Sequence, residues 1–250
     1  MIPRRSPKQI EAVRKAGKLV AEALSIGGHL IKPGVTTRLL DEEVAGFIQG
    51  KGAKALFLGY RGFPAHICAS VNEEVVHGIP GKRVLCEGDI VAVDVGIGVA
   101  GWCADAAATF PVGDISAEAA RLLEVTRLSL DAGIGKVCPG NRLEEVCAAV
   151  QRYVEERGYQ VVRKYAGHGI GRRMHEEPHI PNYVSCELAR QAIVLQTGMV
   201  LAVEPMVNRG TYETVTLSDG WTVVTADGSL SAHFEHTVAV TDAGPDVLTK

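Results

Sequence analysis

Two aspartates stand where the sequence otherwise predicts apolar strand positions. Asp94 follows the run Ile-Val-Ala-Val, and Asp105 lies within Trp-Cys-Ala-Asp-Ala-Ala-Ala-Thr-Phe. A single Asp is more often a turn or surface residue, but both of these have apolar neighbours on each side. Residues 97–101 indicate a turn, and a hairpin folded about the midpoint of residues 99 and 100 places Asp94 opposite Asp105, with Cβ atoms roughly 4.5–5.5 Å apart. A bulge would shift this register. Two such carboxylates repel one another and are costly to desolvate, so their pairing predicts a shared cation.

The second half of the chain contains a similar pair. Gly-Asp-Ile-Val-Ala-Val-Asp at 88–94 resembles Gly-Met-Val-Leu-Ala-Val-Glu at 198–204, which aligns Glu204 with Asp94. Glu235 lies in the next predicted buried strand and takes the place of Asp105. If two related halves meet along a seam, the four carboxylates come together. With two divalent metals about 3.5–4 Å apart, such a cluster is a hydrolytic centre.

A histidine with glycine neighbours is the candidate fifth ligand. His168 lies in Gly-His-Gly-Ile-Gly at 167–171, where the backbone can pack tightly and expose the ring. A lone histidine is more often structural, but a neighbouring four-carboxylate cluster favours a ligand role. Carboxylate oxygens with one imidazole suit manganese, iron(II) or cobalt, and the ligand types leave zinc open, whereas calcium does not favour the histidine.

An internal repeat predicts the elements that position these residues. Leu-Ile-Lys-Pro-Gly at 30–34 recurs as Lys-Val-Cys-Pro-Gly at 136–140, and each copy lies between two helical apolar patterns. The second helix of each pair is predicted to stop at a glycine, Gly52 or Gly158. Strands are predicted at 90–95, 103–110, 199–204 and 234–240. We therefore expect an α+β fold with a largely antiparallel sheet, in one domain of residues 1–250 with similar halves at about 6–112 and 116–242.

Composition limits the function classes. The chain has 250 residues, 46 % hydrophobic and 22 % charged, with a formal net charge of −3 and no basic run, which argues against nucleic-acid or polybasic membrane binding. No signal peptide is visible, and no apolar stretch approaches the roughly 18 residues of a membrane span. The six cysteines form no Cys-x-x-Cys pair, which argues against a zinc finger or a disulfide framework. We expect a cytoplasmic protein.

The five candidate ligands resemble, in order, those of the pita-bread metallopeptidases of family M24. The surrounding segments resemble type I methionine aminopeptidases, in the short bacterial form, over about residues 6–242. They are Tyr-Arg-Gly-Phe-Pro at 60–64, Cys-Ala-Ser-Val-Asn-Glu-Glu-Val-Val-His-Gly-Ile-Pro at 68–80, Met-His-Glu-Glu-Pro at 174–178, Glu-Pro at 204–205 and Ser-Leu-Ser-Ala-His-Phe-Glu-His-Thr at 229–237. The resemblance implies the pita-bread fold, with two pseudo-symmetric halves.

The resemblance also implies roles for individual residues. His77 would contact the scissile amide nitrogen, His175 the carbonyl oxygen, and Glu204 would be both ligand and base. The methionine pocket would be lined by Tyr60, Phe63, Cys68, Met174 and Trp221. Two positions depart from the family pattern: Phe57 stands where cysteine is common, and Met174 where an aromatic residue is common. Asn72 and Ser231 would lie near a monovalent cation, while His233 replaces a frequent glutamine and receives no role.

The implied activity is hydrolytic removal of the initiator methionine from nascent proteins by hydroxide activated at two metals. A free, deformylated α-amine and a small second residue would be preferred. The resemblance further implies a monomer, and transient ribosome contact could involve the Arg172–Arg173 pair. The rival interpretations are a prolidase or X-Pro aminopeptidase on the same fold, and a non-catalytic binding protein. Prolidases usually carry an additional N-terminal domain, and non-catalytic relatives lose ligands.

Overall fold

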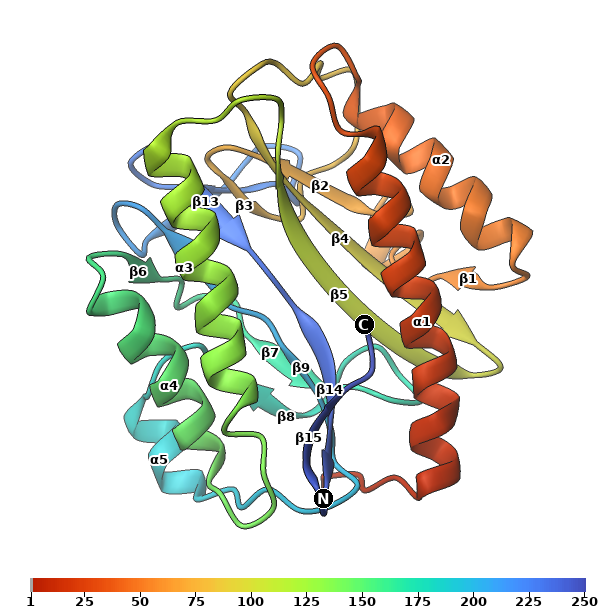
Figure 1. Cartoon of the computed structure of the whole chain (residues 1–250), viewed down its shortest axis with the longest axis vertical. Coiled ribbons are helices and arrows are strands. Elements are labelled where there is room, and N and C mark those ends of the chain that lie inside the picture. The colour runs from red at the N-terminus through yellow and green to blue at the C-terminus, as the bar shows by residue number, and fades with distance from the viewer. Residues whose placement is uncertain (1) are drawn as a thin grey trace.

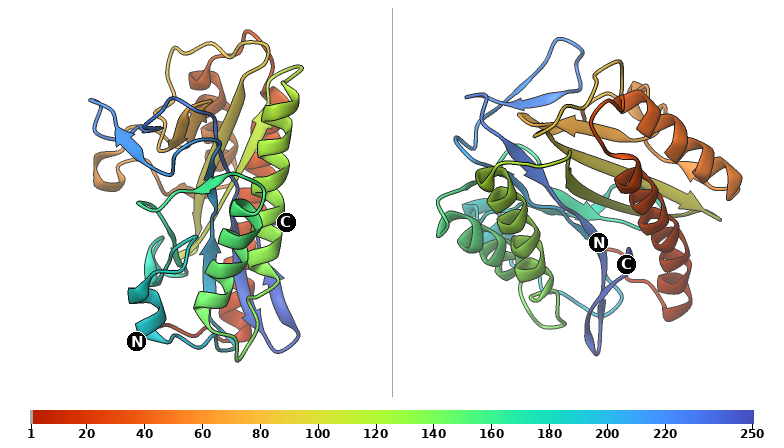
Figure 2. Two further views of the ribbon diagram at one scale, coloured as in Figure 1. Left: turned by 90° about the vertical axis from the view of Figure 1, so that its left-hand side faces the viewer. Right: turned by 45° about the horizontal axis from the view of Figure 1, so that its top comes forward.

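Two helix pairs cover one side of a set of antiparallel strands in the computed structural model of the protein, which describes residues 2–250 (Figure 1). The first pair is α1 (Pro7–Leu30) and α2 (Thr37–Gly50), and the second is α3 (Ala117–Ile134) and α4 (Leu143–Glu155). Figure 2 shows the long helices α1 and α3 on one side of the strands and loop segments on the other. A short helix, α5 (Cys186–Gln191), lies in the second half of the chain.

Two larger sheets form the body of the fold, one in each half, and all strand pairs in them are antiparallel. The first sheet contains β1 (Lys54–Ala55), β2 (Cys68–Val71), β4 (Ile90–Val99) and β5 (Trp102–Pro111). The second has the order β15 (Gly244–Val247), β14 (His236–Thr241), β9 (Val200–Val203), β7 (Gly167–Gly169) and β8 (Glu176–Ile180).

Two small three-stranded sheets and a short helical turn complete the fold. One sheet joins β13 (Ser231–His233), β10 (Met206–Asn208) and β6 (Gln160–Val161), and the other joins β11 (Thr214–Thr216), β12 (Val223–Thr225) and β3 (Glu74–Val76). The turn, η1, spans Tyr60–Gly62. The predicted α+β fold with a largely antiparallel sheet is confirmed.

The repeat predicted from sequence is visible in the backbone. Gly34 and Gly140 have φ of 91° and 88°, and their N–H groups donate to the carbonyls of Leu85 and Leu195, respectively. α2 ends at Gly50 and α4 at Glu155, each followed by a glycine at positive φ, Gly52 and Gly158. The two halves therefore repeat one helix–helix–strand plan, whereas the limits 6–112 and 116–242 stay predictions.

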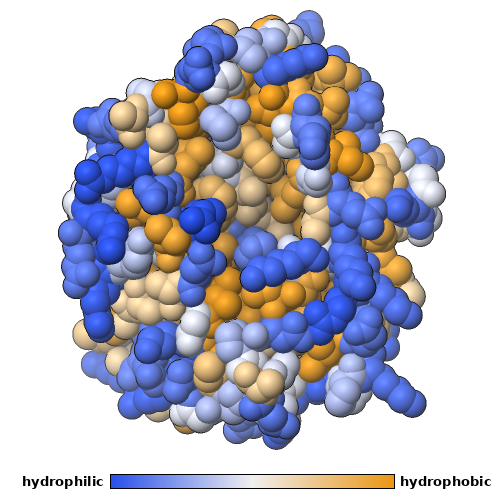
Figure 3. Space-filling model, in the orientation of Figure 1, coloured by the Kyte–Doolittle hydropathy of each residue, from blue (hydrophilic) through white to orange (hydrophobic). Residues whose placement is uncertain are grey.

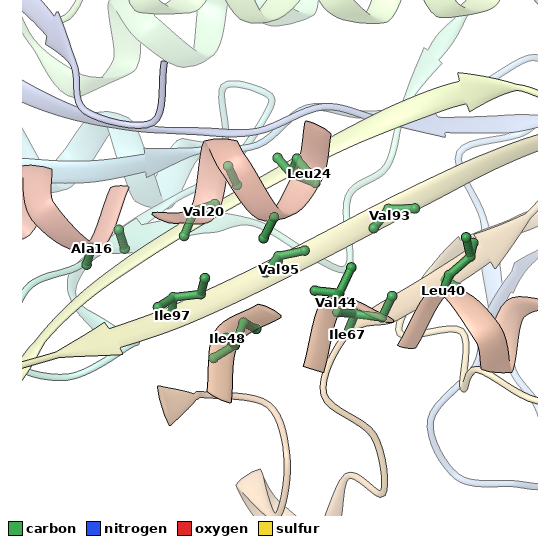
Figure 4. Packing of buried hydrophobic residues seen from close by; sticks show 14 of the residues in the cluster. Ala16, Val20, Leu24, Leu40, Val44, Ile48, Ile67, Val93, Val95 and Ile97 are labelled. Atoms are coloured by element: carbon green, nitrogen blue, oxygen red, sulfur yellow. The ribbon is translucent and has the colours of Figure 1, made fainter. Parts of the chain in front are cut away.

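Helix α1 begins with a capping box. The Ser6 hydroxyl accepts a hydrogen bond from the N–H of Gln9, the Gln9 side chain accepts one from the N–H of Ser6, and Pro7 occupies the first turn. Along α1, apolar residues at helical spacing, such as Val20, pack against α2 and β4 (Figure 4).

Strand alternation then decides which face of β4 carries chemistry. Val91, Val93, Val95 and Ile97 are fully buried, and Figure 4 shows the last three packed between β4 and the helices α1 and α2. Because successive strand residues point to opposite faces, Asp94 points away from the helices.

The predicted register of the β4–β5 hairpin is wrong by two residues. Asp94 pairs with Ala107, and Asp105 pairs with Gly96. The turn lies at Ala100 and Gly101, with φ of 50° and 77°, one position later than expected, and positive φ at both positions is the backbone that a tight two-residue hairpin requires. Moving a turn by one position shifts the register by two, so both carboxylates keep the same face and become diagonal neighbours.

The two halves meet along an antiparallel seam between β5 and residues 233–237. The N–H of Glu235 donates to the carbonyl of Ala107 (2.9 Å). On one side of this bond, the Thr237 hydroxyl accepts from the N–H of Asp105 (3.0 Å) and donates to its carbonyl (2.8 Å). On the other, the Thr109 hydroxyl bonds the backbone of His233. The seam thus places Asp105 and Glu235 beside one another.

Two further expectations can be compared with the structure. Across residues 2–250, every helix is too short or too polar to cross a membrane. All six cysteines are free thiols.

On the helical face, hydrophilic side chains on the outer surfaces flank apolar surface between the helix pairs (Figure 3).

Candidate active site

Five strand segments bring the predicted ligands to one pocket. Asp94 and Asp105 come from β4 and β5, His168 from β7, and the remaining two from just outside β9 and β14. Val203 pairs with His236, so the same register places Glu204 opposite Glu235. The five residues therefore lie together, with the Asp pair diagonal rather than directly opposed and the Glu pair directly opposed; their role as metal ligands stays a prediction.

The glycines around His168 are required by the closeness of neighbouring strands. A Cβ at Gly167 would overlap the carbonyl oxygen of Ala202, and one at Gly169 would overlap that of Glu177. The Nδ1 atom of His168 lies 3.0 Å from the carbonyl oxygen of Gly169, so the neutral ring donates there through Nδ1–H. Its Nε2, with a free lone pair, then lies 3.5 Å from Glu204 Oε1. This is the arrangement of a histidine prepared to bind a metal.

The side chains at the site have the ligand types and the spacing of a cation-binding site. Ligand atoms of Asp105, His168 and Glu235 all lie within 4.8 Å of one another, and all three residues are buried. Within residues 2–250, Asp94 Oδ1, Asp105 Oδ1 and Glu235 Oε1 are buried without any hydrogen-bond partner. Buried carboxylate oxygens are normally paired, so this set fits a divalent metal.

Burial raises the pKa values of all four carboxyl groups. Desolvation, and then the charge of Asp105, holds the pKa of Asp94 well above its usual range, while burial raises that of Asp105 to about 7. The pKa values of Glu204 and Glu235 are also well above normal, again from burial first and then from Asp105. Without a cation, therefore, the cluster holds protons.

Two more histidines face the cluster and are neutral. Burial lowers the pKa of His77 to about 4 and lowers that of His175, with a smaller effect from His175 on His77 and from Arg61 on His175. The His175 ring lies 4.2 Å, centroid to centroid, from the ring of His168. Its Nδ1 lies 2.8 Å from the hydroxyl of Tyr60. A hydroxyl donating to Nδ1 leaves Nε2–H as the donor of the neutral ring.

His77 has an unusual backbone. Its φ is 60°, and a Cβ at the following Gly78 would overlap the carbonyl oxygen of Ala69. The chain can therefore run close along β2 while the His77 ring contacts Tyr165 and Trp221 edge to face, at 5.5 and 6.2 Å. A non-glycine residue in this conformation is strained and is typical of functional sites.

An apolar pocket of about 380 Å³ opens onto the cluster. Its buried wall consists of Phe57, Phe63, Cys68 and Met174, with Tyr60 and Trp221 partly exposed. Phe63 stacks edge to face on Phe57 (6.5 Å) and on Trp221 (5.1 Å). All predicted pocket residues therefore line one cavity. Phe57 and Met174, which depart from the family pattern, are part of its wall.

Comparisons with known proteins agree with this geometry. The sequence pattern of metallopeptidase family M24 matches residues 11–242. The chain belongs to metallopeptidase family M24. It is 52 % identical to a methionine aminopeptidase of Clostridium acetobutylicum, over all of this chain and 99 % of the relative, and 48 % identical to methionine aminopeptidase 1 of Bacillus subtilis, over all of both chains.

Solved structures of M24 peptidases show the same fold. The crystal structure of methionine aminopeptidase from Rickettsia prowazekii matches with a TM-score of 0.96 and 43 % identity, over all of both chains. The prolidase of Pyrococcus horikoshii matches with a TM-score of 0.79 and 21 % identity, but the match covers 63 % of that chain. The predicted pita-bread fold and family are confirmed.

Three residues at this M24 site were not predicted to be functional. Arg61, with φ of 49°, and Tyr165 line the pocket mouth. His233 is buried, and its Nε2 lies 3.9 Å from Glu204 Oε2 without a hydrogen-bond partner among residues 2–250. The sequence held one signal for His233: it stands two residues before Glu235, on the same face of an extended segment.

Asn72 and Ser231 are brought together as expected. The N–H of Ser231 donates to the carbonyl of Asn72 (2.9 Å), and the Asn72 side chain bonds Asp89 and the N–H of Ile90. The monovalent cation expected there stays a prediction.

Proposed function

We propose that this chain is a methionine aminopeptidase that removes the initiator methionine from nascent proteins. The observation that supports this most is the direct opening of the sulfur- and aromatic-lined pocket onto the buried carboxylate–histidine cluster. A hydrolytic centre beside an apolar pocket cleaves next to the side chain that fills the pocket.

The five ligands would hold two divalent metals. They are Asp94, Asp105, His168, Glu204 and Glu235, and their donor types suit cobalt, manganese or iron(II), with zinc also able to bind. When bound, such metals supply Lewis acidity and a water of lowered pKa. The unpaired buried oxygens of this cluster support the assignment.

The chain's own residues would manage the protons of the reaction. Glu204 accepts the proton of the attacking water on its carboxylate, which burial already predisposes to hold one. His175 donates through Nε2–H to the carbonyl oxygen as negative charge develops there. His77 contacts the amide nitrogen that becomes the leaving amine.

Pocket shape explains the substrate. Methionine is unbranched and flexible, and its sulfur packs well against aromatic edges such as those of Phe63 and Trp221. With the methionine side chain in the pocket, the substrate's α-amine would lie at the cluster, so it must be free, as after deformylation. His77 and His175 line the same pocket beside the cluster, so a bulky second residue would crowd them and a small one is preferred.

The proposed activity also predicts the location, the oligomeric state and the partners of the chain. Its substrates would be the N-termini of nascent chains, so we place it in the cytoplasm as a monomer that transiently contacts the ribosome. Asn72 and Ser231 would support the site through a monovalent cation.

Turnover of three peptides tests the proposal. Metal-stripped protein is reloaded with Mn²⁺, Fe²⁺, Co²⁺ or Zn²⁺ without oxygen and given Met-Ala-Ser, Ala-Ala-Ser or acetyl-Met-Ala-Ser. We expect methionine release from the first peptide alone, and about 100–1000-fold slower release in His175→Ala. Ala-Pro is added as a separate control substrate: its hydrolysis instead would favour a prolidase, and no release with any metal from folded protein would favour a non-catalytic binding protein.

A further inference from the structure

The segment before α1 is fastened to the second half of the molecule. The N–H of Arg5 donates to the carbonyl of Gly198 (2.6 Å), and the Arg4 side chain donates through Nε to the carbonyl of Thr197 (3.0 Å). A Cβ at Gly198, which has φ of 95°, would lie 2.6 Å from the carbonyl oxygen of Arg5. The backbone at residue 5 is thus fixed to a segment far from it in the sequence.

The side chain of Arg5 is buried in a closely fitting site. It is 12 % exposed, lies 5.4 Å from the centroid of the Trp102 ring, and forms an ion pair with Glu176, whose side chain is 5 % exposed. A Cβ at Gly171 would overlap the guanidinium. Most of this ion pair is removed from water, and removal of one partner leaves the other charge largely uncompensated.

Glu176 in turn organises the loop that carries His175. One of its oxygens accepts the N–H groups of Arg172 (2.9 Å) and Arg173 (3.1 Å), while the other faces Arg5. The carbonyl of Gly171 accepts the N–H of Cys103, which joins the loop to the start of β5. One carboxylate therefore closes residues 171–176 into a compact loop, and Arg5 is its counter-charge.

We propose that Arg5 is a positioning residue for His175 and acts through Glu176. The inference rests on the proposed function. His175 directly precedes Glu176, and its ring is held on the other side by the Tyr60 hydroxyl. Without Arg5, the buried carboxylate gains water by opening the loop, and His175 moves with it. A displacement of about 1 Å at a catalytic group costs about 100-fold in rate.

The pocket wall provides a contrast within the same loop. Met174 is buried and packs with Phe57, Phe63 and Cys68, contacts that do not involve Arg5. Loss of the Arg5–Glu176 ion pair should therefore lower kcat, through His175, while KM for a methionine peptide changes little.

The experiment compares Arg5→Ala with Arg4→Ala as the matched control, because Arg4 is the neighbouring arginine with only an exposed contact. With Mn²⁺ and Met-Ala-Ser, we expect Arg5→Ala to lose about 10–100-fold in kcat with KM within about threefold. Arg5→Lys, which keeps the charge, should recover most of the loss. Arg5→Ala/Glu176→Gln should turn over faster than Arg5→Ala, because an amide can stay buried without a counter-charge and still accept both N–H bonds.

Hydrogen exchange of the metal-free protein gives a readout independent of activity. The amides of Arg172 and Arg173 should exchange about tenfold faster or more in Arg5→Ala than in Arg4→Ala, with thermal melting and Mn²⁺ affinity otherwise retained. Equal exchange and equal kcat in the two variants would overturn the proposal, as would a fall in kcat matched by loss of Mn²⁺ affinity or by a double variant no better than Arg5→Ala. If wild-type protein fails to cleave Met-Ala-Ser, the exchange result still decides whether Arg5 holds the loop.

Discussion

Replacing Tyr60 by phenylalanine separates two roles that one side chain combines. The ring of Tyr60 lines the methionine pocket, and its hydroxyl lies 2.8 Å from His175 Nδ1. Because burial and then Arg61 lower the pKa of His175, the imidazole is neutral at pH 7 and carries one proton. We expect the hydroxyl to donate to Nδ1, which keeps that proton on Nε2, where it can be donated to the substrate carbonyl. The Tyr60→Phe variant would keep the ring contact and lose the tautomer control.

The size of the effect follows from one hydrogen bond. An uncharged bond of this kind contributes about 0.5–1.5 kcal/mol, and tenfold in rate corresponds to about 1.4 kcal/mol. We therefore expect Tyr60→Phe to lower kcat about 3–10-fold. KM for Met-Ala-Ser should stay within about twofold, because the pocket loses no aromatic surface. The loop bonded by Glu176 still holds the His175 backbone, which limits the loss.

Steady-state kinetics and nitrogen NMR of the imidazoles test this together. Tyr153→Phe, on α4 and away from the pocket, is the matched control for loss of a tyrosine hydroxyl. The NMR spectrum should show His175 mainly in the Nε2–H form in wild type and control, and in mixed tautomers in Tyr60→Phe. An unchanged tautomer, or a kcat equal to that of the control, would refute the reasoning. A loss beyond about 100-fold would show that Tyr60 does more than orient His175.

Three further perturbations act on the buried cluster. Thr237→Val removes the hydroxyl that bonds both the N–H and the carbonyl of Asp105, so urea unfolding of metal-free protein should show a loss of about 2–4 kcal/mol, while Thr237→Ser stays near wild type. His233→Leu removes a buried ring nitrogen that has no partner among residues 2–250, so the metal-free protein should become up to about 1–3 kcal/mol more stable by the same measurement, and any loss would contradict this account. Metal removal should make stability pH-dependent: a carboxyl whose folded pKa is raised destabilises the fold as pH rises from its unfolded pKa, near 4, to its folded value, about 7 for Asp105. Urea titrations from pH 4 to 7 should therefore show metal-free protein losing stability relative to Mn²⁺-loaded protein. If the free energy of unfolding changes with pH in parallel in the two forms, this account is wrong.

Much of the fold could be predicted because an internal repeat encodes the same helix–helix–strand plan in both halves of the chain. Positive φ after proline at Gly34 and Gly140 follows directly from the repeated Pro-Gly sequence, and the Ser6 capping box fixes the start of α1. The hairpin register could not be obtained in this way. Gly98 and Gly101 both suit a turn locally, and the choice between them depends on how far β4 and β5 pair with one another.

The site residues that could be predicted have a local signal in the sequence, whereas the others depend on packing between distant segments. A carboxylate between apolar strand neighbours is anomalous by itself, so Asp94 and Asp105 could be recognised from sequence alone. Arg5 and Glu176 could not, because an exposed ion pair and a buried one have the same residue types. Only the packing of Gly171 and Trp102 around the guanidinium shows that this pair is buried. His233 was overlooked for a similar reason, since its burial depends on the seam with Thr109.

The seam explains how the fold tolerates four acids around one pocket, two of them fully buried. Within each half, apolar residues alternate with the acids, so a sheet can bury one face under helices while its acidic positions face the other half. Where the halves meet, Thr109 and Thr237 bond the backbone of the opposite strand by their hydroxyls. Main-chain polarity is thereby satisfied without any use of the carboxylate oxygens, which stay available for a cation. Replacing either threonine by valine keeps its shape but leaves buried backbone groups of the opposite strand without partners, so the two halves are held together less firmly. The double variant should therefore bind Mn²⁺ more weakly than either single variant when affinity is measured by calorimetric titration, and equal affinities would contradict this role of the seam.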